Sequence, residues 1–137
     1  MFDIVVSAHG DLASSLVRAA EGMLGRLEGV HAVDLSPTDD TTELRRRIES
    51  AIEERPTLVL CDLYGGTPAN ACLLAPFNSP VEVVAGVNLP MLIKAVSLRP
   101  QPLEEAAEKL VQYGRLHVRH PPSRPPDATP QRSGGER

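Results

Sequence analysis

The stretch MFDIVVSAHGD, Met1 to Asp11, decides the fold: a short apolar run ends on His9-Gly10, and a helical pattern follows. We interpret Phe2 to Ser7 as a buried strand that delivers one histidine to the start of a helix. Free backbone N–H groups and the positive end of a helix dipole favour an anion at such a turn. His9 is therefore either a nucleophile that accepts and passes on a phosphoryl group or a structural histidine in a tight turn.

A second stretch of similar design is TLVLCDLYGGTPAN, residues 57–70. Its apolar run ends on Asp62, and a glycine pair leads into Thr67-Pro68, which is typical of a helix start with proline in the first turn. If the two strands are neighbours in a parallel sheet, Asp62 can hydrogen-bond one ring nitrogen of His9. That bond would fix the tautomer, leave the other nitrogen free to attack phosphorus and stabilise the imidazolium formed during transfer.

Strand and helix patterns alternate along the rest of the chain. In chain order we predict strands at 2–7, 30–35, 57–61 and 81–85, helices at 11–24, 41–54, 68–74, 89–98 and 102–113, and a last short edge strand at 115–119, RLHVR. Alternation of this kind is typical of a doubly wound α/β fold with a mostly parallel sheet, here in the order 2-1-3-4. Such a fold binds its ligand at the carboxyl ends of the strands, where the winding direction reverses.

Composition limits the classes of function. With 137 residues, 42% of them hydrophobic, the chain supports one domain with a core, and its net charge of −4 gives no basic surface for nucleic acid. Cys61 and Cys72 have no CxxC spacing, which indicates neither a disulfide framework nor a zinc site and fits a reducing cytoplasm. Because no apolar run approaches about 20 residues and no basic region precedes the first one, we expect neither membrane insertion nor secretion.

Several polar residues invite a functional interpretation. Arg45, Arg46 and Arg47 could form an anion patch, but a charge run on an amphipathic helix usually indicates a solvated face, which we expect here, with partner recognition as the alternative. His31 lies in mid-strand and is expected to be structural, and His117 structural or interfacial. On the first helix, the apolar positions expected to face the core are Leu12, Leu16, Ala19, Ala20, Met23 and Leu24.

Other catalytic classes lack their motifs. GxGxxG and GxxxxGK[ST] are absent, which argues against dinucleotide and P-loop nucleotide binding, and GxSxG is absent, which argues against a serine hydrolase. His9 with Asp62 alone is a poor metal cage. We therefore expect no metal and no organic cofactor.

Three segments together, VSAHGDLA, LCDLYGGTPANA and GVNLPML, resemble the signature segments of the mannose-type enzyme IIA domains of the bacterial phosphoenolpyruvate-dependent sugar phosphotransferase system (PTS). The resemblance covers residues 1 to about 119 in order and spacing. It implies that His9 is the phosphorylated histidine, Asp62 its hydrogen-bonding acid and Thr67 the residue that contacts the phosphoryl group. It also implies a flavodoxin-like fold with a final antiparallel strand, here residues 115–119, that is exchanged between the subunits of a homodimer.

By this resemblance the chain is a cytoplasmic phosphotransferase: His9 accepts a phosphoryl group from HPr and passes it to a IIB component, in association with a membrane IIC/IID complex. The carrier domain would span residues 1–119, followed by a flexible proline-rich tail at 120–137. We expect no fused IIB domain, so a stand-alone regulatory module, whose phosphorylation state controls a partner protein, stays open. An unrelated flavodoxin-like binding domain with an inert His9 stays open as well. The transported sugar cannot be read from a carrier that never contacts it.

Overall fold

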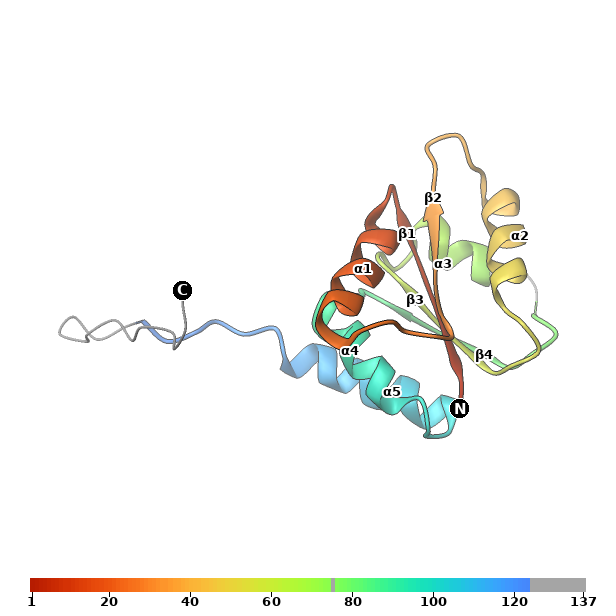
Figure 1. Cartoon of the computed structure of the whole chain (residues 1–137). Helices are drawn as coiled ribbons and strands as arrows, with labels where there is room; N and C mark the ends of the chain where they lie inside the picture. The colour runs from red at the N-terminus through yellow and green to blue at the C-terminus, as the bar shows by residue number, and fades with distance from the viewer. Residues whose placement is uncertain (75, 124–137) are drawn as a thin grey trace.

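The computed structural model describes residues 1–74 and 76–123. Its centre is a four-stranded sheet in the order β2-β1-β3-β4, with every neighbouring pair parallel (Figure 1). The strands are β1 (Asp3–His9), β2 (Val30–Leu35), β3 (Thr57–Cys61) and β4 (Val81–Ala85). The predicted α/β class and strand order are confirmed.

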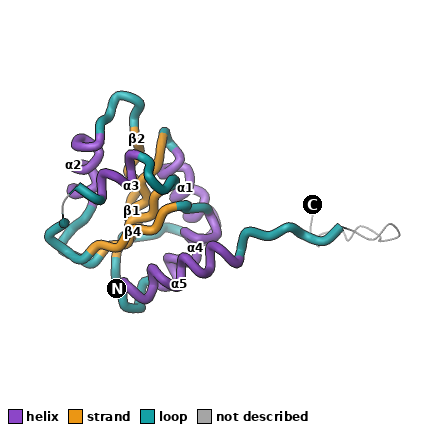
Figure 2. Tube along the Cα trace, turned by 180° about the vertical axis from the view of Figure 1, so that it is seen from behind, coloured by secondary structure: helices purple, strands orange, loops and turns teal. Residues whose placement is uncertain are grey.

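Helices cover both faces of the sheet. In the described residues they are α1 (Leu12–Leu24), α2 (Thr41–Ala51), α3 (Thr67–Cys72), α4 (Leu89–Leu98) and α5 (Leu103–Leu116). The first, fourth and fifth pack on one face and the second and third on the other, as Figures 1 and 2 show from opposite sides. The predicted helices are confirmed, with ends displaced by a few residues. Within the described ranges, no helix combines the length and apolar content needed to cross a bilayer.

The central strand β1 is buried on both faces, which explains why most of its residues are apolar. Ile4, Val6 and Ala8 are fully buried against the layer of α1, α4 and α5, and Val5 is fully buried against the layer of α2 and α3. A strand covered on both faces has no solvated side. Burial of Ile4, Val5 and Val6 contributes about 1.5–3 kcal/mol each, so β1 anchors both layers.

Helix α1 meets the sheet through smaller residues than the sequence pattern predicts. Ala13, Val17 and Ala20 are buried, whereas Leu12 is 41% and Met23 64% exposed. Positions spaced by four and three residues lie on one helix face, and small side chains there let the helix approach the sheet closely. The prediction that Leu12, Met23 and Leu24 face the core is therefore wrong, and it is wrong for Ala19 as well. Gly25 ends the helix with φ of 82°, as its position predicts.

The strand predicted at 115–119 is not formed in this structure. Arg115 and Leu116 belong to the last turn of α5, where His117 donates its backbone N–H to the carbonyl of Tyr113 at 3.0 Å and stacks its ring on the Tyr113 ring at 3.7 Å. These contacts within one helix turn outweigh an alternating pattern that has no sheet edge beside it. The chain then runs away from the domain (Figure 1), and most of the predicted tail, 124–137, lies outside the described residues.

Candidate functional site

The carboxyl ends of β1 and β3 place the two predicted residues together. The strands pair in parallel, with Ser7 opposite Cys61, so that His9 and Asp62 leave the sheet side by side at the point where the winding direction reverses. The backbone N–H groups of Gly86 and Val87 both donate to the Cys61 carbonyl at 2.9 Å. The loop after β4 is thereby fixed to the same edge of the sheet.

His9 and Asp62 are in direct contact. The Nδ1 atom of His9 lies 2.8 Å from Oδ2 of Asp62, and the backbone N–H of His9 donates to the same oxygen at 3.1 Å. An ionised carboxylate can only accept, so Nδ1 carries the proton and Nε2 is the free nitrogen. The His9 side chain is 45% exposed and that of Asp62 14%, so the ring is accessible from solvent while its partner is largely covered.

The hydrogen bonds from His9 also set the charge state of Asp62. Partial burial by itself would raise the pKa of this carboxyl, but the backbone and ring N–H groups of His9, together with the attraction of its charge, outweigh burial. The pKa of Asp62 therefore lies below its ordinary value of 3.8. At neutral pH the group is a carboxylate that can stabilise a positive imidazolium.

The start of α3 lies beside the His9 ring. Gly66 is the N-cap residue of this helix, and a Cβ atom built on it would lie 3.0 Å from Cε1 of the His9 ring. Thr67, the first residue of the helix, follows directly and is half-buried. The structure thus brings His9 and Asp62 into contact. Thr67 is the residue that directly follows Gly66, which lies against the His9 ring. The contact of Gly66 was missed by sequence reasoning, since a glycine pair before a helix carries no signal that one member touches a distant histidine.

Arg45 is the residue for which the sequence interpretation fails. Its side chain is only 8% exposed, and its guanidinium donates to the carbonyls of Ala71 at 3.1 Å and Pro76 at 3.3 Å and lies 3.6 Å from the centre of the Phe77 ring. The expected solvated face is therefore wrong for Arg45, which instead holds the far end of α3. Arg46 is 67% exposed and agrees with the expectation.

Two free, buried cysteines lie before and after the loop that carries Asp62 and Gly66. Cys61 is at the end of β3 and Cys72 is at the end of α3. Their mutual hydrogen bond, with burial, raises the pKa of Cys61. The same bond, with the nearby positive charge of Arg45, lowers the pKa of Cys72 despite burial.

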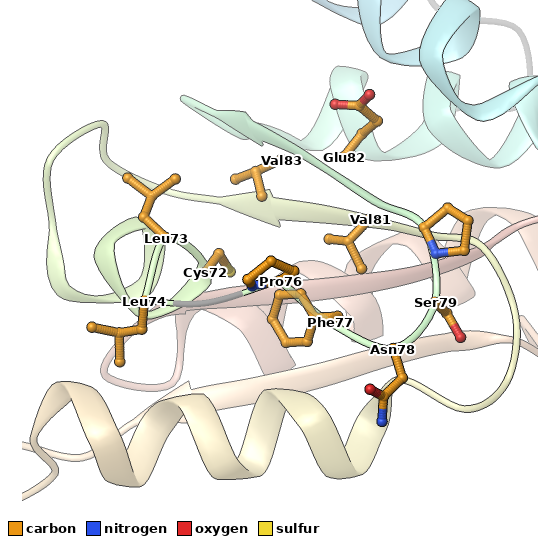
Figure 3. A pocket seen from close by; sticks show the side chains of 11 residues that line it. Cys72, Leu73, Leu74, Pro76, Phe77, Asn78, Ser79, Val81, Glu82 and Val83 are labelled. Atoms are coloured by element: carbon orange, nitrogen blue, oxygen red, sulfur yellow. The ribbon is translucent and has the colours of Figure 1, made fainter.

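In the described residues no candidate metal cluster forms, and the pocket of largest volume among those found lies away from His9 and Asp62. No group of three or more His, Cys, Asp or Glu side chains gathers there to hold a metal ion. A pocket of about 890 Å³ lies along β4 and the end of α3, and Figure 3 shows Leu73, Leu74 and Phe77 among its lining residues. Its lining does not include His9 or Asp62, so it is a separate feature.

Residues 3–112 match the family model of the PTS system fructose IIA component. The chain belongs to this family. This IIA chain is 32% identical over 123 residues to the PTS system mannose-specific EIIAB component of Escherichia coli (strain K12), covering 85% of this chain and 38% of that protein. It therefore spans less than half the length of that relative. The resemblance to mannose-type IIA domains noted in the sequence is confirmed.

Two further comparisons cover a larger share of the relative. The PTS system fructose-specific EIIA component of Bacillus subtilis (strain 168) is 32% identical over 106 residues, which are 72% of this IIA chain and 71% of that protein. The solved mannose/sorbose specific IIA subunit from Enterococcus faecalis superposes with a TM-score of 0.81 at 29% identity, covering 93% of this chain and 98% of that one. The flavodoxin-like arrangement of the IIA chain is thus shared with a solved IIA subunit.

Proposed function

We propose that this IIA chain is a phosphohistidine carrier of the sugar PTS, which accepts a phosphoryl group from HPr on Nε2 of His9 and passes it to a IIB component. The observation that carries this proposal is the contact between Nδ1 of His9 and Oδ2 of Asp62 at 2.8 Å, on a ring that is 45% exposed. A proton held at Nδ1 leaves the lone pair of Nε2 available to a protein that docks at the strand ends.

The transfer is an in-line displacement at phosphorus. The lone pair of Nε2 forms the new N–P bond while the N–P bond of the donor's phosphohistidine breaks and returns its electron pair to the donor's imidazole. His9 becomes positively charged, and Asp62, held as a carboxylate at Nδ1, stabilises that charge. Thr67 and the backbone N–H groups of the adjacent turns donate to the phosphoryl oxygens. Because the group moves between two imidazole nitrogens, positioning and charge stabilisation supply the catalysis, and no metal or organic cofactor is needed.

The remaining assignments follow from family membership. We propose that residues 1–119 form the carrier domain, with 120–137 as a tail, and that the carrier works in the cytoplasm beside a membrane IIC/IID complex. The sugar is left unassigned, since a carrier hands over only the phosphoryl group.

We also propose that the carrier is a homodimer. Leu116 and Val118, at the end of α5 and just after it, are 72% and 77% exposed, and Leu73 is 74% exposed beside the pocket along the edge strand β4 (Figure 3). Large apolar side chains that gather on the surface are typical of a site that another protein covers. In a dimer, the segment after α5 of each subunit covers the pocket along β4 of the other subunit.

The test is reconstitution with phosphoenolpyruvate, enzyme I and HPr, followed by intact mass and peptide mapping. The proposal predicts a gain of one phosphoryl group that is acid-labile, depends on HPr and maps to His9. His9→Ala should abolish it, while His31→Ala, in mid-strand β2, serves as the matched control and should retain it. Labelling that persists in His9→Ala would refute the proposal. Full labelling without onward transfer to any IIB protein would instead favour the regulatory module.

A further inference from the structure

The two adjacent glycines of the site loop have different physical reasons to be glycine. Gly65 has a φ of +79°, which side-chain-bearing residues rarely adopt, and a Cβ there would meet nothing within 4 Å. Gly66 has φ of −77° and ψ of 170°, an extended conformation open to any residue. The backbone therefore gives no reason for glycine at 66.

The reason at 66 is the His9 ring. A Cβ on Gly66 would lie 3.0 Å from Cε1 of His9 and 3.3 Å from the backbone carbonyl oxygen of Leu63. Carbon atoms in ordinary contact are about 3.5–4.0 Å apart, so the space for even a methyl group is already filled from two sides. The imidazole edge lies directly against the backbone at the start of α3.

We propose that Gly66 is a positioning residue for His9, because its missing side chain sets the direction in which Nε2 points. This rests on the proposed function. The bond from Nδ1 to Asp62 holds one corner of the ring and still allows the ring to tilt about that bond. Cε1 is bonded to both ring nitrogens, so contact at Cε1 removes the tilt. Two contacts, one at Nδ1 and one at Cε1, then fix the line along which Nε2 meets phosphorus.

Residue 66 cannot make room by moving away from the ring. Its N–H donates to the Leu63 carbonyl at 3.1 Å, and its own carbonyl accepts from the N–H of Asn70 at 2.9 Å. The His9 side chain, 45% exposed, is the part that can move. A methyl group at 66 therefore displaces the ring and crowds the side from which a phosphoryl group on Nε2 is reached. Since a displacement of about 1 Å can cost on the order of a hundredfold in such reactions, the shift of about half an ångström that restores an ordinary carbon contact should cost about tenfold.

The experiment compares Gly66→Ala with Gly22→Ala, a glycine in α1 whose added Cβ would meet nothing within 4 Å. We expect Gly66→Ala to lower kcat for phosphoryl transfer from phosphorylated HPr about tenfold, to leave the KM for HPr unchanged, and to shift the NMR resonance of the His9 Hε1 proton, which is bonded to Cε1. Gly22→Ala should change none of these. A wild-type kcat together with an unmoved Hε1 resonance in Gly66→Ala would overturn the proposal.

A second measurement needs neither a variant nor phosphotransfer. In the unmodified chain, the close approach predicts a strong nuclear Overhauser effect between the Hα protons of Gly66 and Hε1 of His9. Its absence would overturn the proposal even if Gly66→Ala failed to fold. If the wild-type chain accepted no phosphoryl group while this effect was present, the proposed function would fail and the positioning of the ring would stand.

Discussion

His9 donates two hydrogen bonds, from its backbone N–H and from Nδ1, to a single oxygen of Asp62 at 3.1 and 2.8 Å across 53 positions of sequence. One bond fixes the end of β1 and the other fixes the ring, so the carboxylate aligns backbone and side chain together. Loss of its charge should therefore affect both the chemistry at His9 and the stability of the loop.

Asp62→Asn tests the chemical part of this relationship. Asparagine keeps the size and one acceptor oxygen but removes the charge that stabilises the imidazolium. A charge-assisted hydrogen bond contributes about 1.5–3 kcal/mol, so phosphoryl acceptance from HPr should slow by roughly tenfold to a hundredfold if the bond acts in the transition state. Asp11→Asn is the matched control, because Asp11 precedes α1 at the same edge and makes no side-chain capping bond. Equal rates in both variants would contradict the assigned role.

The pH dependence of unfolding tests the stability part. The folded-state pKa of Asp62 lies below 3.8, so the group contributes stability above its ordinary pKa and loses that contribution as pH falls through the folded-state value. The difference in free energy of unfolding between wild type and Asp62→Asn, measured with urea, should be constant near neutral pH and shrink as the pH drops below about 4. A difference that stays constant into strong acid would mean that the pKa is not lowered.

The contact between His9 and Asp62 could be predicted from the sequence for a simple physical reason. Parallel strands end at the same edge of the sheet, so two apolar runs that end on His9 and Asp62 suffice to bring those residues together. Arg45 and Gly66 could not be predicted, since burial of a guanidinium and contact with a distant ring depend on how α3 packs. The prediction of a strand at 115–119 failed because alternation over only five residues does not distinguish a strand from the end of a helix and the residues that follow it.

Thr67→Val tests the third member of the site. Valine keeps the branched shape at the start of α3 but lacks the hydroxyl that we propose donates to the phosphoryl group. Loss of one hydrogen bond of about 0.5–1.5 kcal/mol should slow phosphoryl acceptance roughly twofold to tenfold. Thr42→Val, at the exposed start of α2, is the control. If the two variants have the same rate in the HPr assay, Thr67 does not contact the phosphoryl group.

Two neighbouring arginines of α2, Arg45 and Arg46, should differ sharply in their effect on stability. Arg45→Ala removes a buried guanidinium bonded to the carbonyls of Ala71 and Pro76 and stacked on Phe77, which should cost about 2–3 kcal/mol. Arg46→Ala removes an equal charge that is 67% exposed and pairs with Glu43 at the surface, so it should change stability by less than about 0.5 kcal/mol. Urea unfolding of both variants checks this, and similar midpoints would show that Arg45 is as solvated as Arg46.

The proposed homodimer makes the last prediction. Val118 is 77% exposed in the single chain, so Val118→Glu should leave the fold of each subunit intact, whereas in the dimer it would place a charge in an apolar contact. Burial of a valine contributes about 1.5–3 kcal/mol, and a two-fold interface contains the residue twice. The dissociation constant of the dimer should therefore rise by on the order of a hundredfold or more. Met23→Glu, on the exposed side of α1 and 64% exposed, is the matched control and should remain dimeric. Sedimentation equilibrium over a range of concentrations distinguishes the cases. A wild-type chain that stays monomeric at all concentrations, or a Val118→Glu variant that dimerises like wild type, would show that the segment after α5 does not hold two copies together.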